Sequence, residues 1–309
     1  MNIPIIHPHG LKKGDTVAVV APAGPLKSRD ALDKSISFLE TMGFHVFFAE
    51  RIFESSGYLA GGDRDRAEEL MQAFEDDAIQ AIVGLRGGYG CARLIPFLSI
   101  ERLKNHPKLF TGFSDLTTLH LFFNRYLGWI TIHGPMAANP GIGSHSDDQQ
   151  SHLVSLWTDS EYRPDFNFSQ MEIWKPGKTE GRLAGGCLST IISSIGTSYE
   201  IDTDGAILFL EDVGEPPYRL DRMLTQLKLT GKFKSLAGVI LGRFFECDSP
   251  EIGYSTNDVL KEILQQLNIP ILANFPAGHG PDNWAIPLGA KARIDTDTLS
   301  IELLESAVL

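Results

Sequence analysis

The sequence predicts an α/β protein, in which an N-terminal parallel-sheet α/β domain precedes a C-terminal domain built around β-structure. Two observations lead to this prediction. Short apolar, β-rich runs alternate with amphipathic helical segments over residues 1–137, and this alternation is typical of a parallel sheet covered by helices. The chain has 309 residues, of which 43% are hydrophobic, and that is enough to bury the cores of two domains.

The first domain alternates regularly between the two kinds of element. The segment Arg29–Met42 places Leu32, Ile36 and Leu39 on one helical face, and Gly43 follows as the expected C-cap. Pro96 weakens the helical pattern of the segment Cys91–Leu98. The expected strands are Thr16–Ala21, His45–Ala49, Ile79–Leu85, Leu109–Gly112 and Trp129–Ile132, and the remaining expected helices are Arg64–Phe74 and Asp115–Leu127.

The chain changes character after residue 137. Residues 138–180 are polar and weakly periodic, so we expect a connecting region with one helix near Asp147–Trp157. The C-terminal domain is expected to span residues 181–309. Its expected strands are Ala206–Leu210, Leu236–Leu241, Ile271–Ala273, Ala290–Asp295 and Leu299–Leu303, and its expected helices are Leu188–Ile195, Tyr218–Leu229 and Asn257–Leu267.

Composition narrows the class of protein. A formal net charge of −12 argues against nucleic acid as a partner, because binding phosphates requires cations. The cysteines Cys91, Cys187 and Cys247 are far apart in the sequence, as expected in a reducing compartment. The first residues lack the pattern of a signal peptide, and no apolar run reaches the roughly 18 residues of a membrane helix. We therefore expect a cytoplasmic protein with no membrane partner.

The segment Thr111–Asp115 (TGFSD) is the first candidate for chemistry. Ser114 lies between an expected strand and an expected helix, which would place its hydroxyl at the carboxyl end of the sheet, where open α/β folds bind ligands. The positive end of the helix would also stabilise a developing oxyanion. The segment resembles a nucleophile elbow but lacks the second glycine of G-x-S-x-G. A serine here also fits an ordinary helix N-cap, so both interpretations stay open.

The glycine-rich segment Arg86–Gly90 (RGGYG) is the second candidate, because it follows another expected strand. Glycines allow a backbone N–H to approach a ligand closely, so this loop and the N–H of Asp115 would supply two oxyanion donors. An ordinary tight turn and a phosphate cradle are the alternatives. The sequence contains neither G-x-x-x-x-G-K-[ST] nor G-x-G-x-x-G, and this argues against a nucleotide cofactor.

Two acids follow the apolar run of the third candidate segment, Leu208–Tyr218. Glu211 is expected at the tip of the strand, where a carboxylate would orient a histidine, whereas Glu215 lies in a proline-flanked turn before a helix. A pair of acids is also compatible with a glycosidase or a metal site. A metal site needs more ligands than the segment offers, so we expect neither a metal nor another cofactor.

The fourth candidate is His279, which lies between two glycines after the expected strand Ile271–Ala273. His133 has a similar context, and a single histidine is more often structural than catalytic. Ser114, Glu211 and His279 nevertheless occur in the order serine, acid, histidine. A serine hydroxyl needs an adjacent base to become a nucleophile, and the base needs a partner that fixes its tautomer.

These segments together resemble the LD-carboxypeptidase family of serine peptidases. The resemblance rests on Gly112–Asp115, the Arg86–Gly90 loop, Leu208–Leu224 and Gly278–Gly280. Further support comes from Lys13–Asp15, Tyr58–Gly61, His133–Met136 and Pro287–Gly289, so the similarity extends over nearly the whole chain in the order of the family. Family members remove a terminal D-amino acid from cell-wall peptides.

The resemblance implies specific roles for these residues. Ser114 would be the nucleophile, His279 the general base and acid, and Glu211 the acid that orients the histidine. Glu211 is preferred to Glu215, because relatives that lack the turn around Glu215 still keep an acid at the strand end. The backbone N–H groups of Gly88 and Asp115 would form the oxyanion hole.

The resemblance also implies a muropeptide substrate and a homodimer. Removal of a terminal residue needs recognition of a free carboxylate, and our own hypothesis is that Arg86 binds it in a bidentate manner. One departure from the family is Cys187, where many relatives carry asparagine, and we expect a small buried residue there. Three alternatives stay open: a self-immunity peptidase that cleaves a peptidyl-nucleotide antibiotic, a non-catalytic module that binds cell-wall peptides, and a glycosidase that uses Glu211 and Glu215.

Overall fold

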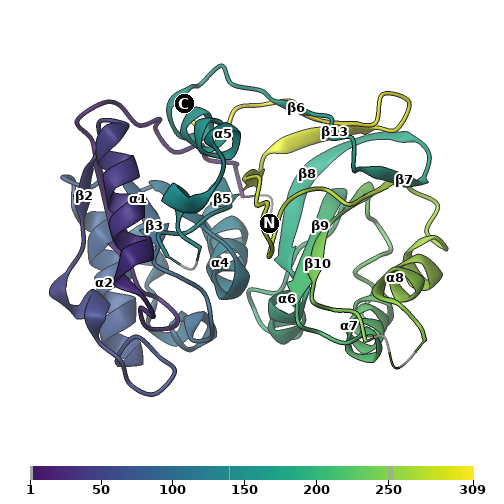
Figure 1. Cartoon of the computed structure of the whole chain (residues 1–309), viewed down its shortest axis with the longest axis horizontal. Coiled ribbons are helices and arrows are strands. Elements are labelled where there is room, and N and C mark those ends of the chain that lie inside the picture. The colour runs from purple at the N-terminus through teal and green to yellow at the C-terminus, as the bar shows by residue number, and fades with distance from the viewer. Residues whose placement is uncertain (1–2, 139, 250, 252) are drawn as a thin grey trace. The chain divides into compact units, whose positions relative to one another are not determined.

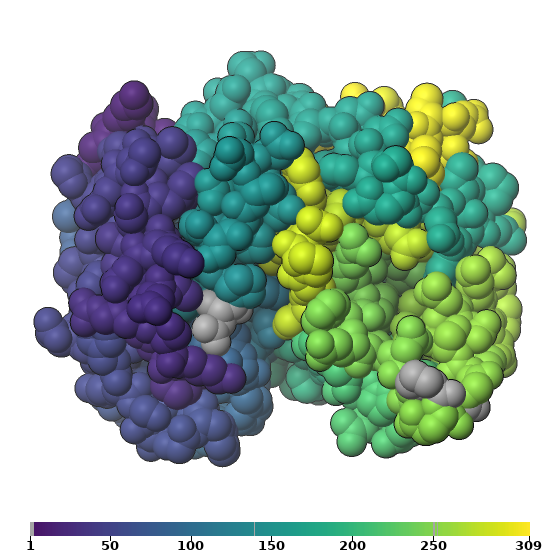
Figure 2. All heavy atoms as spheres, in the orientation of Figure 1, coloured from purple at the N-terminus to yellow at the C-terminus, as the bar shows by residue number. Residues whose placement is uncertain are grey.

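The computed structural model describes residues 3–138, 140–249, 251 and 253–309. The chain folds into two compact units. The first comprises Met1–Tyr162, Trp284–Pro287 and Ser306–Leu309, and the second comprises Arg163–Asn283 and Leu288–Glu305. The C-terminal part of the chain, yellow in Figures 1 and 2, therefore supplies residues to both units. The division at residues 137 and 180 that the sequence suggests stays a prediction.

The first unit is built on a sheet with the strand order β12-β5-β4-β3-β1-β2. Strands β1 to β5 pair with one another in parallel, as the alternating sequence pattern predicts. Because β2 lies on one side of β1 and β3 on the other, the strand order reverses at β1. The strands are β1 (Thr16–Val20), β2 (His45–Phe47), β3 (Ala81–Gly84), β4 (Leu109–Gly112), β5 (Thr131–His133) and β12 (Ile286–Leu288).

The order reversal determines where a ligand can bind. In open α/β sheets, ligands bind outside the carboxyl ends of the strands where the order reverses. The segments that come directly after β1, β3 and β4 begin with Ala21–Pro25, Leu85–Gly90 and Phe113–Asp115, and the last of these enters a 3₁₀ turn at Ser114. They bring the glycine-rich segment and Ser114 to this edge of the sheet.

Helices cover this sheet and bury an aromatic cluster against it. Phe74, Phe110, Phe123 and Trp129 are almost fully buried, and the Phe123 ring centroid lies 5.1–5.5 Å from those of the other three. Such pairs add to the stabilisation from apolar burial. The helices are α1 (Arg29–Thr41), α2 (Asp63–Glu75), α3 (Ile100–Leu103), α4 (Thr117–Leu127) and α5 (Asp147–Thr158), with 3₁₀ turns η1 (Glu50–Phe53), η2 (Cys91–Arg93), η3 (Ile95–Phe97), η4 (Ser114–Leu116) and η5 (Ile142–Ser144).

The second unit contains a sheet with the strand order β6-β14-β13-β8-β9-β10-β11-β7. Strands β8 to β11 are parallel, and the flanking strands pair antiparallel. The strands are β6 (Asp165–Phe166), β7 (Glu172–Lys175), β8 (Lys178–Cys187), β9 (Ala206–Val213), β10 (Gly238–Phe245), β11 (Ile271–Ala273), β13 (Lys291–Asp295) and β14 (Ser300–Leu303). The helices are α6 (Leu188–Ser194), α7 (Pro217–Leu229) and α8 (Thr256–Leu264). In the part of the chain that the structure describes, no helix is long and apolar enough to cross a membrane.

Three local expectations were wrong. The segment Cys91–Leu98 forms two 3₁₀ turns instead of one helix, because Pro96 cannot donate the hydrogen bond that would continue it. The expected connecting region contains β6 and β7 besides helix α5. Strand β9 continues to Val213 and pairs with β10 up to that residue, so Glu211 lies inside the strand and not at its tip.

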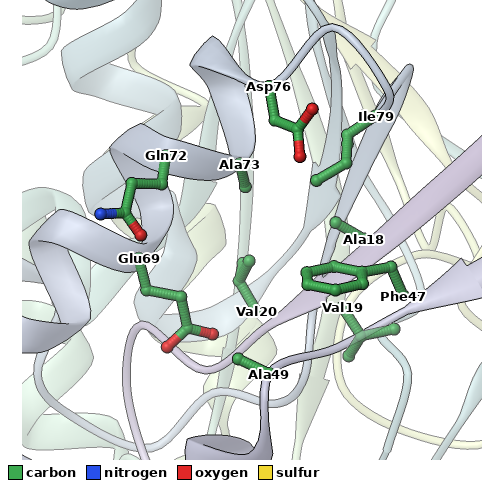
Figure 3. A pocket seen from close by; sticks show the side chains of 10 residues that line it. All are labelled: Ala18, Val19, Val20, Phe47, Ala49, Glu69, Gln72, Ala73, Asp76 and Ile79. Atoms are coloured by element: carbon green, nitrogen blue, oxygen red, sulfur yellow. The ribbon is translucent and has the colours of Figure 1, made fainter.

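A hollow of about 150 Å³ lies between β1, β2 and α2 in the first unit. Figure 3 shows apolar side chains such as Val20, Phe47 and Ile79 around it, with Glu69 and Asp76 among the polar groups. The Glu69 carboxylate accepts a hydrogen bond from Arg51, and burial raises the pKa of Glu69. None of the candidate catalytic residues lines this hollow, so the hollow is not the candidate active site.

The aromatic cluster leads to a stability prediction. Phe123→Ala is expected to lower the free energy of unfolding by about 3–5 kcal/mol, because it removes a buried ring and leaves a cavity. Leu229→Ala is the control, since that side chain is 82% exposed and should change stability little. Urea denaturation followed by fluorescence measures both. An unchanged midpoint for Phe123→Ala would contradict the packing described above.

Candidate active site

The backbone at Ser114 has an uncommon conformation. Strand β4 is fully buried and ends at Gly112, Phe113 is extended, and Ser114 adopts a φ of +62° at the first position of η4. A residue other than glycine rarely adopts a positive φ, and such residues cluster at functional sites. The N-cap position of η4 is occupied by Phe113. The local geometry is therefore that of a strained strand-to-helix turn, as in a nucleophile elbow.

Glycines make room for this turn. A Cβ on Gly112 would lie 2.4 Å from Leu116 Cδ2, and a Cβ on Gly87 would lie 2.8 Å from both Cβ and Oγ of Ser114. The Arg86–Gly90 loop thus packs directly against Ser114. Gly88 is exposed and adopts a φ of +114°, a conformation that glycine adopts without strain. The structure brings the serine and the glycine-rich loop together, as the sequence analysis expects.

Arg86 is held at the start of this loop. Its guanidinium donates a hydrogen bond from Nη1 to the carbonyl oxygen of Pro25, at 3.2 Å. Burial lowers the pKa of Arg86 from its ordinary value, although an arginine stays protonated at neutral pH. The side chain is half-buried, and it places a positive charge in the loop that contacts Ser114.

His120 is a residue that the sequence analysis missed. It lies on α4, its ring is fully buried, and Nε2 donates to the carbonyl oxygen of Gly112 at 2.8 Å. This bond ties the end of β4 to the helix that follows Ser114. Burial lowers the pKa of His120 to about 4, so the ring is neutral at physiological pH. Its position six residues after Ser114, on the expected helix, was the available sequence signal.

The second unit holds a carboxylate–imidazole pair. Glu211 is fully buried, and its Oε2 accepts hydrogen bonds from the backbone N–H of His279 at 3.0 Å and from Nδ1 of the ring at 2.7 Å. A Cβ on Gly278 would lie 2.5 Å from the same oxygen. Gly278 and Gly280, with φ values of +104° and +124°, therefore let the loop bring His279 onto Glu211.

Electrostatics define the state of this histidine. Burial by itself would lower the pKa of His279, but the charge of Glu211 and its hydrogen bond outweigh burial and raise the pKa above the ordinary value. The bond at Nδ1 fixes the tautomer of the neutral ring, so that Nε2 carries the lone pair. A histidine held in this way can accept a proton at Nε2 and remain stabilised as an imidazolium.

The other acids and Cys187 have different environments. Glu215 forms an ion pair with Arg219 at 3.4 Å, which fits an acid at a helix start. Asp212 is buried, and burial together with the Glu211 charge raises its pKa to about 6. Burial raises the pKa of the Cys187 thiol well above its ordinary value. Across residues 3–138, 140–249, 251 and 253–309, no cluster of metal-binding side chains occurs.

His133, the alternative histidine, is fully buried in the first unit. Its ring lies 5.8 Å from that of Phe113 and 6.4 Å from that of His120. Among the candidates, Arg86, Gly88, Ser114 and Asp115 belong to the first unit, and Glu211 and His279 belong to the second. The structure thus shows two groups of candidate residues, which we call half-sites for the function proposed below: the Ser114 turn with the Arg86–Gly90 loop in the first unit, and the Glu211–His279 pair in the second.

Comparison with known proteins shows the family to which the chain belongs. Residues 17–134 match the model of the LD-carboxypeptidase N-terminal domain, and residues 180–294 match that of the LD-carboxypeptidase C-terminal domain. The chain therefore belongs to the LD-carboxypeptidase family, a family of peptidases.

Three relatives illustrate the similarity. A probable murein peptide carboxypeptidase of Bacillus subtilis is 37% identical over 94% of this chain and 91% of that protein. The murein tetrapeptide carboxypeptidase of Pseudomonas aeruginosa is 34% identical over 92% of this chain and 94% of that protein. The microcin C7 self-immunity protein MccF of Escherichia coli is 27% identical over 96% and 94% of the two chains. A solved structure of MccF in its apo state shares the fold, with a TM-score of 0.90 at 24% identity over 98% of this chain and 100% of that one.

The Glu211–His279 pair can be tested without a substrate. Glu211→Gln is expected to lower the pKa of His279, because the neutral amide removes the negative charge that stabilises the imidazolium. Glu215→Gln is the matched control, since Glu215 pairs with Arg219 and should leave the pKa of His279 unchanged. NMR titration of the histidine ring protons measures both. Equal His279 pKa values in wild type and Glu211→Gln would show that the Glu211 charge does not stabilise the His279 imidazolium.

Proposed function

We propose that this protein is a serine-type LD-carboxypeptidase that hydrolyses the L,D-peptide bond before the C-terminal D-alanine of murein tetrapeptides. The observation that carries the proposal is the buried Glu211 carboxylate, which holds Nδ1 of His279 at 2.7 Å. This pair has the geometry of a general base and its orienting acid. The strained turn at Ser114 supports the choice of nucleophile.

In the proposed mechanism, the two half-sites act on the same bond. Ser114 Oγ attacks the carbonyl carbon of the scissile bond, and His279 Nε2 accepts the hydroxyl proton. The negative charge that develops on the carbonyl oxygen is stabilised by the backbone N–H groups of Gly88 and Asp115. His279 then donates its proton to the leaving amine, and D-alanine departs. Water, deprotonated by His279, attacks the acyl-enzyme and releases the shortened peptide and Ser114.

The substrate assignment rests on the relatives. Two of them are named as murein peptide carboxypeptidases, so we place the protein in the cytoplasmic recycling of cell-wall peptides. Removal of a single terminal residue requires recognition of a free carboxylate, and Arg86 supplies a positive charge in the loop beside Ser114. We also propose that the protein is a homodimer, as many family members are.

A self-immunity peptidase is the second candidate function, because MccF matches 96% of this chain. Such an enzyme would use the same triad but would need an aromatic clamp for a nucleobase. The turn Glu215–Tyr218 and the helix that follows it favour the muropeptide alternative in the sequence. The two functions therefore differ in the substrate and not in the chemistry at Ser114.

The proposed function is tested by substitution of the nucleophile. Wild type is expected to release D-alanine from a murein tetrapeptide, and Ser114→Ala is expected to lower kcat by about 10⁴-fold or more, because the triad acts as a unit. Mass spectrometry of the products measures both. An aminoacyl-adenylate mimic in parallel identifies the self-immunity alternative if it alone is cleaved. D-alanine release by Ser114→Ala at the wild-type rate would contradict the role of Ser114. Full activity of Ser114→Ala on a glycoside substrate would favour the glycosidase, whereas wild type that cleaves no substrate and does not react with a serine-directed phosphonate would favour a binding module.

The role of Arg86 is tested with a pair of substrates. Arg86→Ala is expected to raise KM for the tetrapeptide by about 10-fold or more, because a charged hydrogen-bonding partner of the carboxylate is lost. The same substitution should matter little for a tetrapeptide whose C-terminus is amidated, which the wild type should bind poorly. Unchanged KM and kcat for the free-acid substrate would rule out this role.

A further inference from the structure

The side chain of Asp115 lies between the two segments that would form the oxyanion hole. Its Oδ2 accepts a hydrogen bond from the backbone N–H of Cys91 at 2.8 Å, and the Gly90 backbone also donates a hydrogen bond to this carboxylate. Asp115 is 7% exposed. The residue directly after Ser114 therefore reaches back to the end of the Arg86–Gly90 loop.

A buried cation accompanies this carboxylate. The side chain of Arg66 is fully buried; it donates to the carbonyl oxygen of Pro22 and to Asp63, the latter at 2.6 Å. A Cβ on Gly90 would lie 2.6 Å from Nη1 of Arg66, so the guanidinium lies against the loop. Burial raises the pKa of Asp115, and the positive charge of Arg66 opposes this effect.

Arg66 belongs to a small network of ion pairs. Asp63 also pairs with Arg93 at 2.8 Å, so Asp63 links the two arginines. Isolated buried charges are costly, whereas paired and hydrogen-bonded ones are tolerated. A carboxylate accepts an N–H group more strongly than a neutral amide does, and the positive charge of Arg66 favours the ionised form of Asp115.

We propose that Asp115 is a positioning residue for the oxyanion hole: its carboxylate, with Arg66 as counter-charge, fixes the loop that carries the Gly88 N–H against the Ser114 turn. This inference rests on the proposed function, because it assumes that Ser114 attacks a carbonyl. The main chain of Asp115 supplies one donor, and its side chain orders the loop that supplies the other. Such donors act on charge that exists only in the transition state, so their loss lowers kcat and leaves KM unchanged.

The first experiment compares Asp115→Asn with wild type. An amide keeps the size but has one acceptor oxygen, and its NH₂ group would face a backbone N–H. We expect kcat on the tetrapeptide to fall about 100-fold with KM within twofold, as for loss of an oxyanion donor. The rate of Ser114 phosphonylation by a fluorophosphonate should fall in parallel. Asp258→Asn, which alters an exposed acid of the α8 capping box, is the control and should retain both rates.

Arg66→Gln is the second variant, because it removes the counter-charge without changing the carboxylate. It should slow phosphonylation in the same direction, by a smaller factor. Circular dichroism melting identifies which variants are folded. Either folded variant alone is enough to test whether the Asp115 side chain positions the oxyanion hole. Wild-type rates in a folded variant, or an increase in KM with kcat retained, would overturn the inference.

Phosphonylation of Ser114 and release of D-alanine test the role of Asp115 and the proposed substrate separately. Phosphonylation needs no cell-wall peptide, so wild type that is labelled at Ser114 but releases no D-alanine disproves the substrate while the comparison of variants still stands. Wild type that is not labelled overturns both.

Discussion

The positive φ of Ser114 is the constraint on which the first unit depends. A residue in this conformation costs about 1–3 kcal/mol unless its surroundings enforce it. Here Leu116 fills the space beside Gly112, Gly87 contacts the serine itself, and His120 holds the Gly112 carbonyl. The sheet order then brings the loops after β1 and β3 to the same edge. These contacts together hold the Ser114 turn in its strained conformation.

The main constraint in the second unit is the burial of a carboxylate. Glu211 lies inside a strand at 0% exposure, where an unpaired charge would be strongly unfavourable. Two hydrogen bonds from one residue, His279, reach Oε2 and offset part of this cost, and they are possible because Gly278 leaves room for the loop. The pairing is thus needed for stability as well as for the proposed chemistry. Neither half-site contains the whole proposed triad.

Much of this organisation follows from the sequence. The α/β class and the family were predicted correctly, because strand and helix periodicity and the spacing of the glycine-rich segments are local signals. The extension of β9 past Glu211 was not predictable, since two acids in succession do not resemble a buried strand; pairing with β10 overrides that preference. His120 and the carboxylate of Asp115 were missed because their hydrogen bonds go to backbone groups, which no residue pattern identifies; for His120, its position on the helix after Ser114 was the available sequence signal. The roles of Ser114, Glu211 and His279 stay predictions.

The discontinuous first unit has a consequence for biosynthesis. Leu309 exchanges hydrogen bonds with Gly10 and Pro8, at 3.1 and 3.0 Å, and Val308 is fully buried. Domains usually begin to fold in order of their synthesis on the ribosome. Here the contacts that residues 284–287 and 306–309 make within the first unit form only after most or all of the second unit has been synthesised, so the first unit is completed late in translation.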